Sequence, residues 1–236
     1  MKLKISEIIG PVTQGEGQFI GTPAIFIRAF GCDYSCLGCD TRYAREGNDF
    51  HELSADEIAD IVKQNSGGYA CLVVLTGGNP CLQDFSELLL LLAGRNYTTA
   101  IETQGSIAPT WLSDLDYLTL SPKAPSTGKK TEITSVISCI DAFGKHRNYS
   151  VCIKIVVGGH TDLDYAEQMF AGLRNHYGHT GMTFCVQPFN SRLNPAIQEL
   201  KTAYIELAIE VMRRKMFHIQ VLPQLHVFLY GNKRGV

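Results

Sequence analysis

The stretch Gly31-Cys32-Asp33-Tyr34-Ser35-Cys36-Leu37-Gly38-Cys39-Asp40-Thr41 places three cysteines close together in the chain. Three residues separate Cys32 from Cys36, and two separate Cys36 from Cys39. A loop this short can direct all three thiolates at one metal centre, and three protein ligands leave a fourth position open. Because an open position is typical of a working metal centre, we expect the fold to be organised around this loop.

Two kinds of metal site compete for these cysteines. A structural zinc site needs a distant His or Cys as fourth ligand, and zinc sites usually come as pairs of short Cys or His spacings. The nearest match to a second pair is His176 and His179, in a polar turn. A redox Cys-x-x-Cys pair is disfavoured by the third cysteine. The other site is a [4Fe–4S] cluster with one iron left free.

Length and composition narrow the class of protein. The 236 residues suffice for one domain of barrel or α/β type, which we expect to cover residues 1–236. A net charge of -2 gives no support for a nucleic-acid partner. The longest apolar run, residues 88–93, is too short to cross a bilayer, so we expect no membrane association. The N-terminal residues 1–7 include no long apolar stretch, which favours a cytoplasmic, reducing location with free thiols.

Strands and helices are predicted to alternate along the chain. Expected strands cover residues 5–12, 23–30, 70–75, 98–102, 117–120, 151–157, 183–186 and 219–222. Expected helices cover residues 54–64, 87–93, 134–143, 162–175 and 194–215, the last opened by Asn194-Pro195. The other five cysteines fall mostly in apolar segments and are expected to be core residues: Cys71, Cys81, Cys139, Cys152 and Cys185. This order predicts an α/β fold with a mainly parallel sheet and crossover helices.

Polar residues follow four of the expected strands, at positions 76–79, 102–104, 121–123 and 187–190. The carboxyl ends of parallel strands meet at one edge of a sheet, so these segments predict one ligand site built from several loops. Two features outside that edge are also suited to ligands. The glycine-rich segment around Gln14 and Glu16 permits close approach of a polar ligand. Arg28 interrupts an apolar strand and needs a carboxylate partner, either from the fold or from a substrate.

The C-x3-C-x2-C spacing after an apolar strand resembles the cluster loop of the radical S-adenosylmethionine (SAM) superfamily. The resemblance implies that Cys32, Cys36 and Cys39 hold a [4Fe–4S] cluster whose free iron binds SAM. Reduction of the cluster, by an electron donor such as flavodoxin, then releases a 5′-deoxyadenosyl radical. The resemblance also implies an incomplete (β/α)6-type barrel, whereas the residue spacing alone leaves open whether the sheet closes.

Motifs outside this loop narrow the resemblance. They are Gln14-Gly15-Glu16-Gly17, Arg28, Cys39-Asp40-Thr41, Thr76-Gly77-Gly78, Ser121-Pro122-Lys123, Gln187-Pro188 and Pro223-Gln224-Leu225-His226. Together and in this order they resemble 7-carboxy-7-deazaguanine synthase, a family in queuosine biosynthesis. The implied reaction is a radical ring contraction of 6-carboxy-5,6,7,8-tetrahydropterin with loss of ammonia, in which SAM is regenerated. The resemblance further implies a bound Mg2+ ion and a homodimer.

Individual residue roles follow from this resemblance. Thr41 matches a magnesium ligand, and a hydroxyl is a suitable hard donor. Arg28 is expected to bind the substrate carboxylate. The other expected substrate-binding residues are Gln14, Gly15, Glu16, Thr76 and His226. The expected SAM-binding residues are Gly38, Gly78, Ser121, Pro122, Lys123, Gln187, Pro188, Phe189 and Asn190.

Two positions depart from the pattern. Asn79 stands where the superfamily usually has glutamate; its amide oxygen can accept a hydrogen bond from the SAM amino group but lacks the charge. Val227 stands where relatives often have lysine.

Two rival functions remain. A glycyl-radical enzyme activating protein shares the cysteine spacing but needs an open groove for a protein loop. A non-catalytic zinc or iron–sulfur module has no need of polar clusters at four strand ends.

Overall fold

The apolar segments of the chain pair into one curved sheet. The computed structural model describes residues 1–144, 148–178, 181–190, 195–231 and 233–235. Within these residues the sheet has nine strands in the order β3-β1-β2-β4-β5-β6-β7-β8-β9. Their bounds are β1 (Lys2–Thr13), β2 (Pro23–Ala29), β3 (His51–Ser54), β4 (Leu72–Gly77), β5 (Thr98–Thr103), β6 (Tyr117–Leu120), β7 (Val151–Val157), β8 (Thr183–Pro188) and β9 (Gln220–Val221).

Most of the sheet is parallel, as the alternation of elements predicts. From β2 through β4 to β9 every neighbouring pair is parallel. The exception is β1, which pairs antiparallel with both β2 and β3. Strand β3 was not predicted, because His51-Glu52-Leu53-Ser54 has too little apolar character to be distinguished from a loop. With β3 and β9 at its two edges the sheet stays open, which confirms the incomplete barrel.

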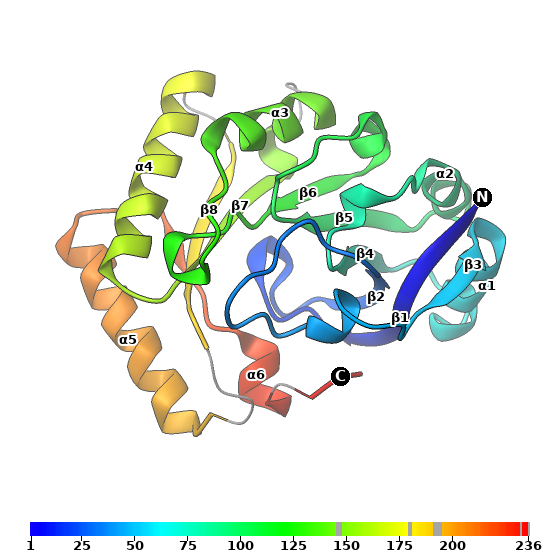
Figure 1. Cartoon of the computed structure of the whole chain (residues 1–236), viewed down its shortest axis with the longest axis horizontal. Helices are drawn as coiled ribbons and strands as arrows, with labels where there is room; N and C mark the ends of the chain where they lie inside the picture. Colours follow the sequence, from blue (N-terminus) through cyan, green and yellow to red (C-terminus); the bar gives the residue numbers. More distant parts are fainter. Residues whose placement is uncertain (145–147, 179–180, 191–194, 232, 236) are drawn as a thin grey trace.

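Helices surround this sheet on its outer side (Figure 1). They are α1 (Ala55–Asn65), α2 (Ser86–Gly94), α3 (Ile133–Phe143), α4 (His160–Tyr177) and α5 (Ile197–Arg213), whereas the short helix α6 (Leu225–Tyr230) is not on that outer side. The start of α1 is the capping box that the sequence predicts. The Ser54 hydroxyl accepts from the backbone N–H of Glu57 at 3.2 Å, and the Glu57 carboxylate accepts from the Ser54 N–H at 2.7 Å.

Two helices in the C-terminal part of the chain differ from the sequence prediction. Helix α5 begins at Ile197, later than predicted, and the expected cap residue Asn194 lies outside the described residues. Helix α6 was not predicted, because its six residues are too few to show a helical period. Figure 1 places α6 near the opening between the two sheet edges, on the same side as the C-terminus.

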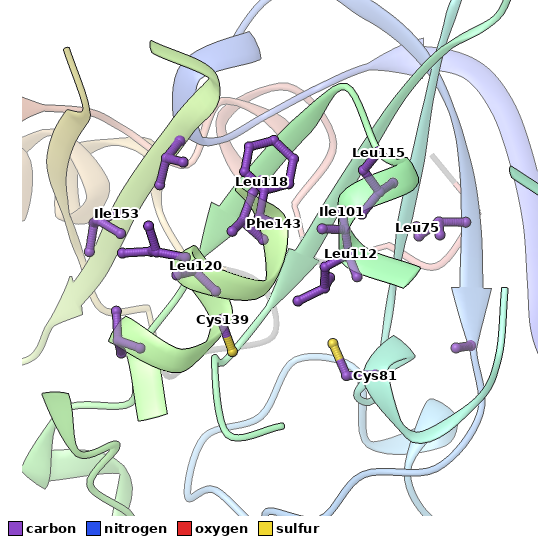
Figure 2. Close-up of a cluster of buried hydrophobic side chains, with 14 of the residues drawn as sticks. Leu75, Cys81, Ile101, Leu112, Leu115, Leu118, Leu120, Cys139, Phe143 and Ile153 are labelled. Atoms are coloured by element: carbon purple, nitrogen blue, oxygen red, sulfur yellow. The ribbon is translucent and has the colours of Figure 1, made fainter. Parts of the chain in front are cut away.

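The core lies between the sheet and the outer helices. Figure 2 shows side chains from the strands, including Leu75, Ile101 and Ile153, in the same buried cluster as Phe143 of α3. Burial of each such side chain contributes about 1.5–3 kcal/mol to folding. All eight cysteines are free thiols, and the core prediction is confirmed for Cys81, Cys139, Cys152 and Cys185, whereas Cys71 is half-buried.

In the described part of the chain, no helix is long and apolar enough to cross a bilayer.

Candidate active site

A cavity of about 450 Å³ opens at the carboxyl ends of the parallel strands. This size suits a small-molecule ligand. Nearly all the residues expected to bind a ligand line it, from strand ends far apart in the sequence. They are Gln14, Gly15, Glu16, Arg28, Cys32, Cys36, Gly38, Cys39, Thr41, Thr76, Gly78, Ser121, Lys123, Gln187, Phe189, Asn190 and His226. The structure therefore brings these residues together in one cavity at the sheet edge.

Two of the expected SAM-binding residues, and Asn79 beside them, do not line this cavity. Pro122 and Pro188 are buried beside chain neighbours that do line it. Asn79 is fully buried and also lies outside the cavity lining. The alternative zinc pair gains no support, because His176 is not among the cavity residues and His179 lies outside the described residues.

The cysteine loop is held against the strand ends by backbone contacts. The Gly31 N–H donates to the Ala44 carbonyl and the Leu37 N–H to the Thr127 carbonyl, both at 2.8 Å. Gly38 has φ +67°, and a Cβ there would overlap the ring of Phe189. Only glycine meets both constraints, so Phe189 packs directly on the loop backbone.

The three cysteines supply a suitable donor set for an iron–sulfur cluster. All three are half-buried free thiols on one loop, and all three line the cavity. Burial is the main factor that raises the pKa of Cys32 and Cys36, while Lys123 partly opposes this for Cys36. Metal binding displaces the thiol protons. Among the described residues, no three His, Cys, Asp or Glu side chains lie close enough together to hold a metal ion.

Gly78, which we expect to let SAM approach the strand end, also has a packing reason to be glycine. A Cβ at Gly78 would overlap the carbonyl oxygen of Gly31 at the start of the cysteine loop. The Gly78 N–H donates to Ala29 at 3.0 Å, and the Asn79 N–H donates to Gly31 at 2.7 Å. Gly78 thus joins the end of β4 to the cysteine loop, while still lining the cavity.

Arg28 has a carboxylate partner within the fold. Its Nε donates to Glu7 Oε1 at 2.8 Å, and the Tyr43 hydroxyl donates to the same oxygen at 2.7 Å. Arg234 Nε donates to the other oxygen of Glu7 at 3.1 Å. Burial alone raises the pKa of Glu7, but these donors outweigh it and the net pKa is lowered. Glu7 is ionised at neutral pH, and it orients Arg28 at the cavity wall.

A buried lysine at the cavity wall was missed by the sequence analysis. Lys154 on β7 is 1% exposed, and its Nζ forms ion pairs with Glu16 and Glu102. Glu16 also accepts from the amides of Gln187 and Gln224, both at 2.8 Å. Burial raises the pKa of Glu16, but Lys154, His226 and the Gln224 amide together outweigh burial and hold this pKa well below its usual range. The sequence did contain a signal for Lys154. It is a charged residue inside the apolar strand 151–157, and the same feature drew attention to Arg28.

Helix α6 brings His226 to the glycine-rich segment. The Leu225 N–H donates to the Gly15 carbonyl at 2.9 Å, and a Cβ on Gly15 would overlap the His226 ring. His226 contributes to the lowered pKa of Glu16 through its charge. The histidine near the C-terminus is thus part of the cavity, although its helix was not predicted.

Hydroxyl and amine groups complete the cavity wall near the cysteines. The Thr41 hydroxyl lies 3.7 Å from Cys39 Sγ. The Lys123 amine donates to the Ser121 hydroxyl at 3.3 Å. Gln187 is fully buried, and among the described residues its Oε1 has no hydrogen-bond partner. A buried acceptor without a partner at a cavity wall is a position for a ligand N–H group.

Comparison with known proteins identifies the family. Residues 26–171 match the radical SAM superfamily. The chain is 32% identical to 7-carboxy-7-deazaguanine synthase of Bacillus subtilis (strain 168), over 99% of this chain and 98% of that protein. It is 34% identical to the Bacillus cereus enzyme of the same name, over 100% and 99%. The crystal structure of QueE from Escherichia coli has the same fold, with TM-score 0.68, 24% identity and coverage of 94% and 95%. The chain therefore belongs to the 7-carboxy-7-deazaguanine synthase family of radical SAM enzymes, which use a [4Fe–4S] cluster and SAM.

Proposed function

We propose that this chain is a radical SAM carbon–nitrogen lyase that converts 6-carboxy-5,6,7,8-tetrahydropterin to 7-carboxy-7-deazaguanine with loss of ammonia. One observation carries the proposal. The three thiols of the cysteine loop and the carboxylates of Glu16 and Glu102 line the same cavity. A cofactor held by the thiols and a substrate held by the carboxylates would therefore share one cavity.

The cysteine side supports cofactor binding. The loop holds the cluster through Cys32, Cys36 and Cys39. When bound, the cluster and SAM together supply the 5′-deoxyadenosyl radical that abstracts a hydrogen atom from the substrate. The polar groups that follow β6 and β8, including Ser121 and Asn190, are on the cavity wall where SAM needs hydrogen-bond partners.

The carboxylate side supports recognition of a pterin. The amide and amino edge of a pterin offers N–H donors, which ionised Glu16 and Glu102 accept. Lys154 forms an ion pair with each of these carboxylates. The free Oε1 of Gln187 offers a further acceptor. This set of acceptors favours a nitrogen-rich ring over a purely apolar substrate.

A further part of the cavity wall has a cationic side chain and hydroxyl groups, which suit the substrate carboxylate. Arg28 lines the cavity and donates to Glu7 through its Nε; within the described residues no contact of its other N–H groups competes with a substrate carboxylate. Thr76 is paired with Arg28 across β2 and β4 and lines the same wall. Thr41 offers a hard oxygen ligand for Mg2+ near the cysteine loop.

The resemblance to the family also leads us to propose a homodimer, an electron donor such as flavodoxin, and a cytoplasmic location. Ile205, Ile209 and Met212 support self-association, because they lie on one face of α5 and are 43%, 55% and 57% exposed. Sedimentation of the purified chain tests this, and a species of monomer mass at micromolar concentration would contradict the dimer.

Anaerobic turnover tests the function. The protein is reconstituted with iron and sulfide and mixed with SAM, reductant, Mg2+ and the carboxytetrahydropterin, and the product is identified by mass spectrometry. We expect 7-carboxy-7-deazaguanine from the native chain and none from Cys36→Ser. Cys71→Ser is the matched control, because Cys71 is a half-buried thiol outside the cavity. A cluster-loaded protein that cleaves SAM but leaves the pterin unchanged would point to a protein substrate instead.

A further inference from the structure

Two buried amides converge on an aspartate of the cysteine loop. Asp33 Oδ1 accepts from Asn79 Nδ2 and from Gln104 Nε2, both at 2.7 Å. Asn79 is 0% exposed and Gln104 is 3% exposed, whereas Asp33 itself is on the surface. Gln104 Nε2 also donates to Cys32 Sγ at 3.7 Å. One amide thus contacts both the aspartate and the adjacent cysteine.

Asn79 is held rigidly by the rest of its amide. Its Oδ1 accepts from the Thr103 hydroxyl at 2.8 Å and from the Cys81 N–H at 3.2 Å. Its Nδ2 donates a further bond to the Ser106 hydroxyl at 3.1 Å. An asparagine amide has two N–H donors and two acceptor positions. These three contacts, together with the bond to Asp33, use all four of them. Asn79 has no hydrogen-bonding group left for SAM, in contrast to the expectation from its place in the sequence.

The chemistry of the contacts explains why residue 79 is an amide. A carboxylate at this position has no N–H to donate to Asp33 and would place two like charges against each other. The amide instead ties the exposed aspartate to the ends of β4 and β5. The cysteine next to that aspartate is fixed in turn, because the loop is short.

We propose that Asp33, Asn79 and Gln104 form a positioning group, here called the Asp33 bracket, that orients Cys32 for the cluster and tunes the cluster's reduction potential. Hydrogen bonds to the sulfurs and nearby charge both set the potential of an iron–sulfur cluster. The Gln104 N–H stabilises the more negative, reduced form, so it raises the potential. The Asp33 carboxylate disfavours the reduced form, so it lowers the potential. The proposal rests on cluster binding and is independent of the identity of the substrate.

Two nearly isosteric substitutions separate these effects. Gln104→Met keeps the length of the side chain but removes both donors. Asp33→Asn removes the charge but keeps an oxygen that accepts from both amides. Thr99→Val is the matched control, because Thr99 is a buried residue at the other end of β5 whose hydroxyl bonds to the Asp116 carboxylate, far from the cysteine loop in the sequence.

Redox titration of the reconstituted proteins, followed by electron paramagnetic resonance and without substrate, is the experiment. We expect a more negative midpoint potential for Gln104→Met, a less negative one for Asp33→Asn, and no change for Thr99→Val. A second outcome also supports the Asp33 bracket: Gln104→Met fails to load iron, while Thr99→Val loads iron normally.

Unchanged potentials and normal iron loading in Gln104→Met and Asp33→Asn would overturn the inference. Shifts in the same direction for both variants would overturn its electrostatic part. Neither result affects the proposed function, which fails separately if the native chain loads a cluster and does not convert the pterin. A native chain that binds no cluster would refute both.

Discussion

Replacement of Lys154 by methionine tests the buried charge group of the cavity. Methionine has a similar length and keeps most of the packing, but it cannot neutralise Glu16 and Glu102. Lys154 is 1% exposed, and the two carboxylate side chains are 13% and 23% exposed. The variant therefore leaves two partly buried carboxylates close together without their shared cation.

The size of the effect follows from the burial. Removing one partner of a buried ion pair typically costs about 3–5 kcal/mol, because it leaves an uncompensated charge. We take the lower end, about 3 kcal/mol, because both carboxylates reach the cavity. For a chain of this length that corresponds to a fall of roughly 6–12 °C in Tm.

The pH dependence of this loss identifies its electrostatic origin. The pKa of Glu16 is lowered in the folded chain, so its contribution is present above its ordinary value of 4.5 and is lost only as the pH falls through the depressed value. The pKa of Lys154 is raised, so its contribution is present below its ordinary value of 10.5 and is lost as the pH rises through the raised value. In the native chain this ion-pair group therefore adds a constant amount between about pH 5 and pH 9.

Thermal unfolding of the cluster-free chain from pH 8 to pH 5 is the assay. In Lys154→Met we expect part of the lost Tm to return as the pH falls, because protonation of one carboxylate relieves the repulsion. The double variant Lys154→Met/Glu102→Gln should recover at least half of the loss at pH 8. A fall in Tm that is independent of pH and unchanged in the double variant would refute the electrostatic account and indicate lost packing instead.

Two further predictions concern the cysteine loop and the arginine. Gly38→Ala should reduce iron loading severalfold, because its Cβ would overlap Phe189; Gly47→Ala is the control, since Gly47 also has positive φ but nothing within 4 Å of the added Cβ. Iron and sulfide analysis measures the difference, and equal loading of the two variants would contradict the packing argument. Arg28→Met should raise the KM for the pterin about 10-fold or more, as expected for loss of a hydrogen bond to a charged group. Steady-state kinetics measures this, and an unchanged KM would remove Arg28 from substrate binding.

The location of the site could be predicted from the sequence because it depends on order along the chain. Strands that alternate with helices become parallel neighbours, and their carboxyl ends meet at one edge. Thr76, Ser121 and Gln187 therefore line one cavity, although they are distant in sequence. The short spacing of the cysteines likewise needed no knowledge of tertiary contacts.

The partners of individual side chains could not be predicted in the same way, because they depend on register. Glu7 and Arg28 face each other only because β1 and β2 pair antiparallel with this register. Neither the antiparallel pairing nor the register follows from the alternation of apolar residues in the two strands. Asn79 binds Asp33 across 46 positions of sequence, a contact that no local pattern encodes.

The most direct test of the central claim is transfer of a substrate hydrogen to SAM. The reconstituted native chain is incubated anaerobically with SAM, reductant, Mg2+ and carboxytetrahydropterin that carries deuterium on the carbons of its reduced ring. Because the thiols and the carboxylates share one cavity, we expect deuterium in the 5′-deoxyadenosyl group of recovered SAM, together with 7-carboxy-7-deazaguanine. Reductive cleavage of SAM without deuterium transfer, and with the pterin left intact, would contradict the claim that this cavity brings the pterin to the radical.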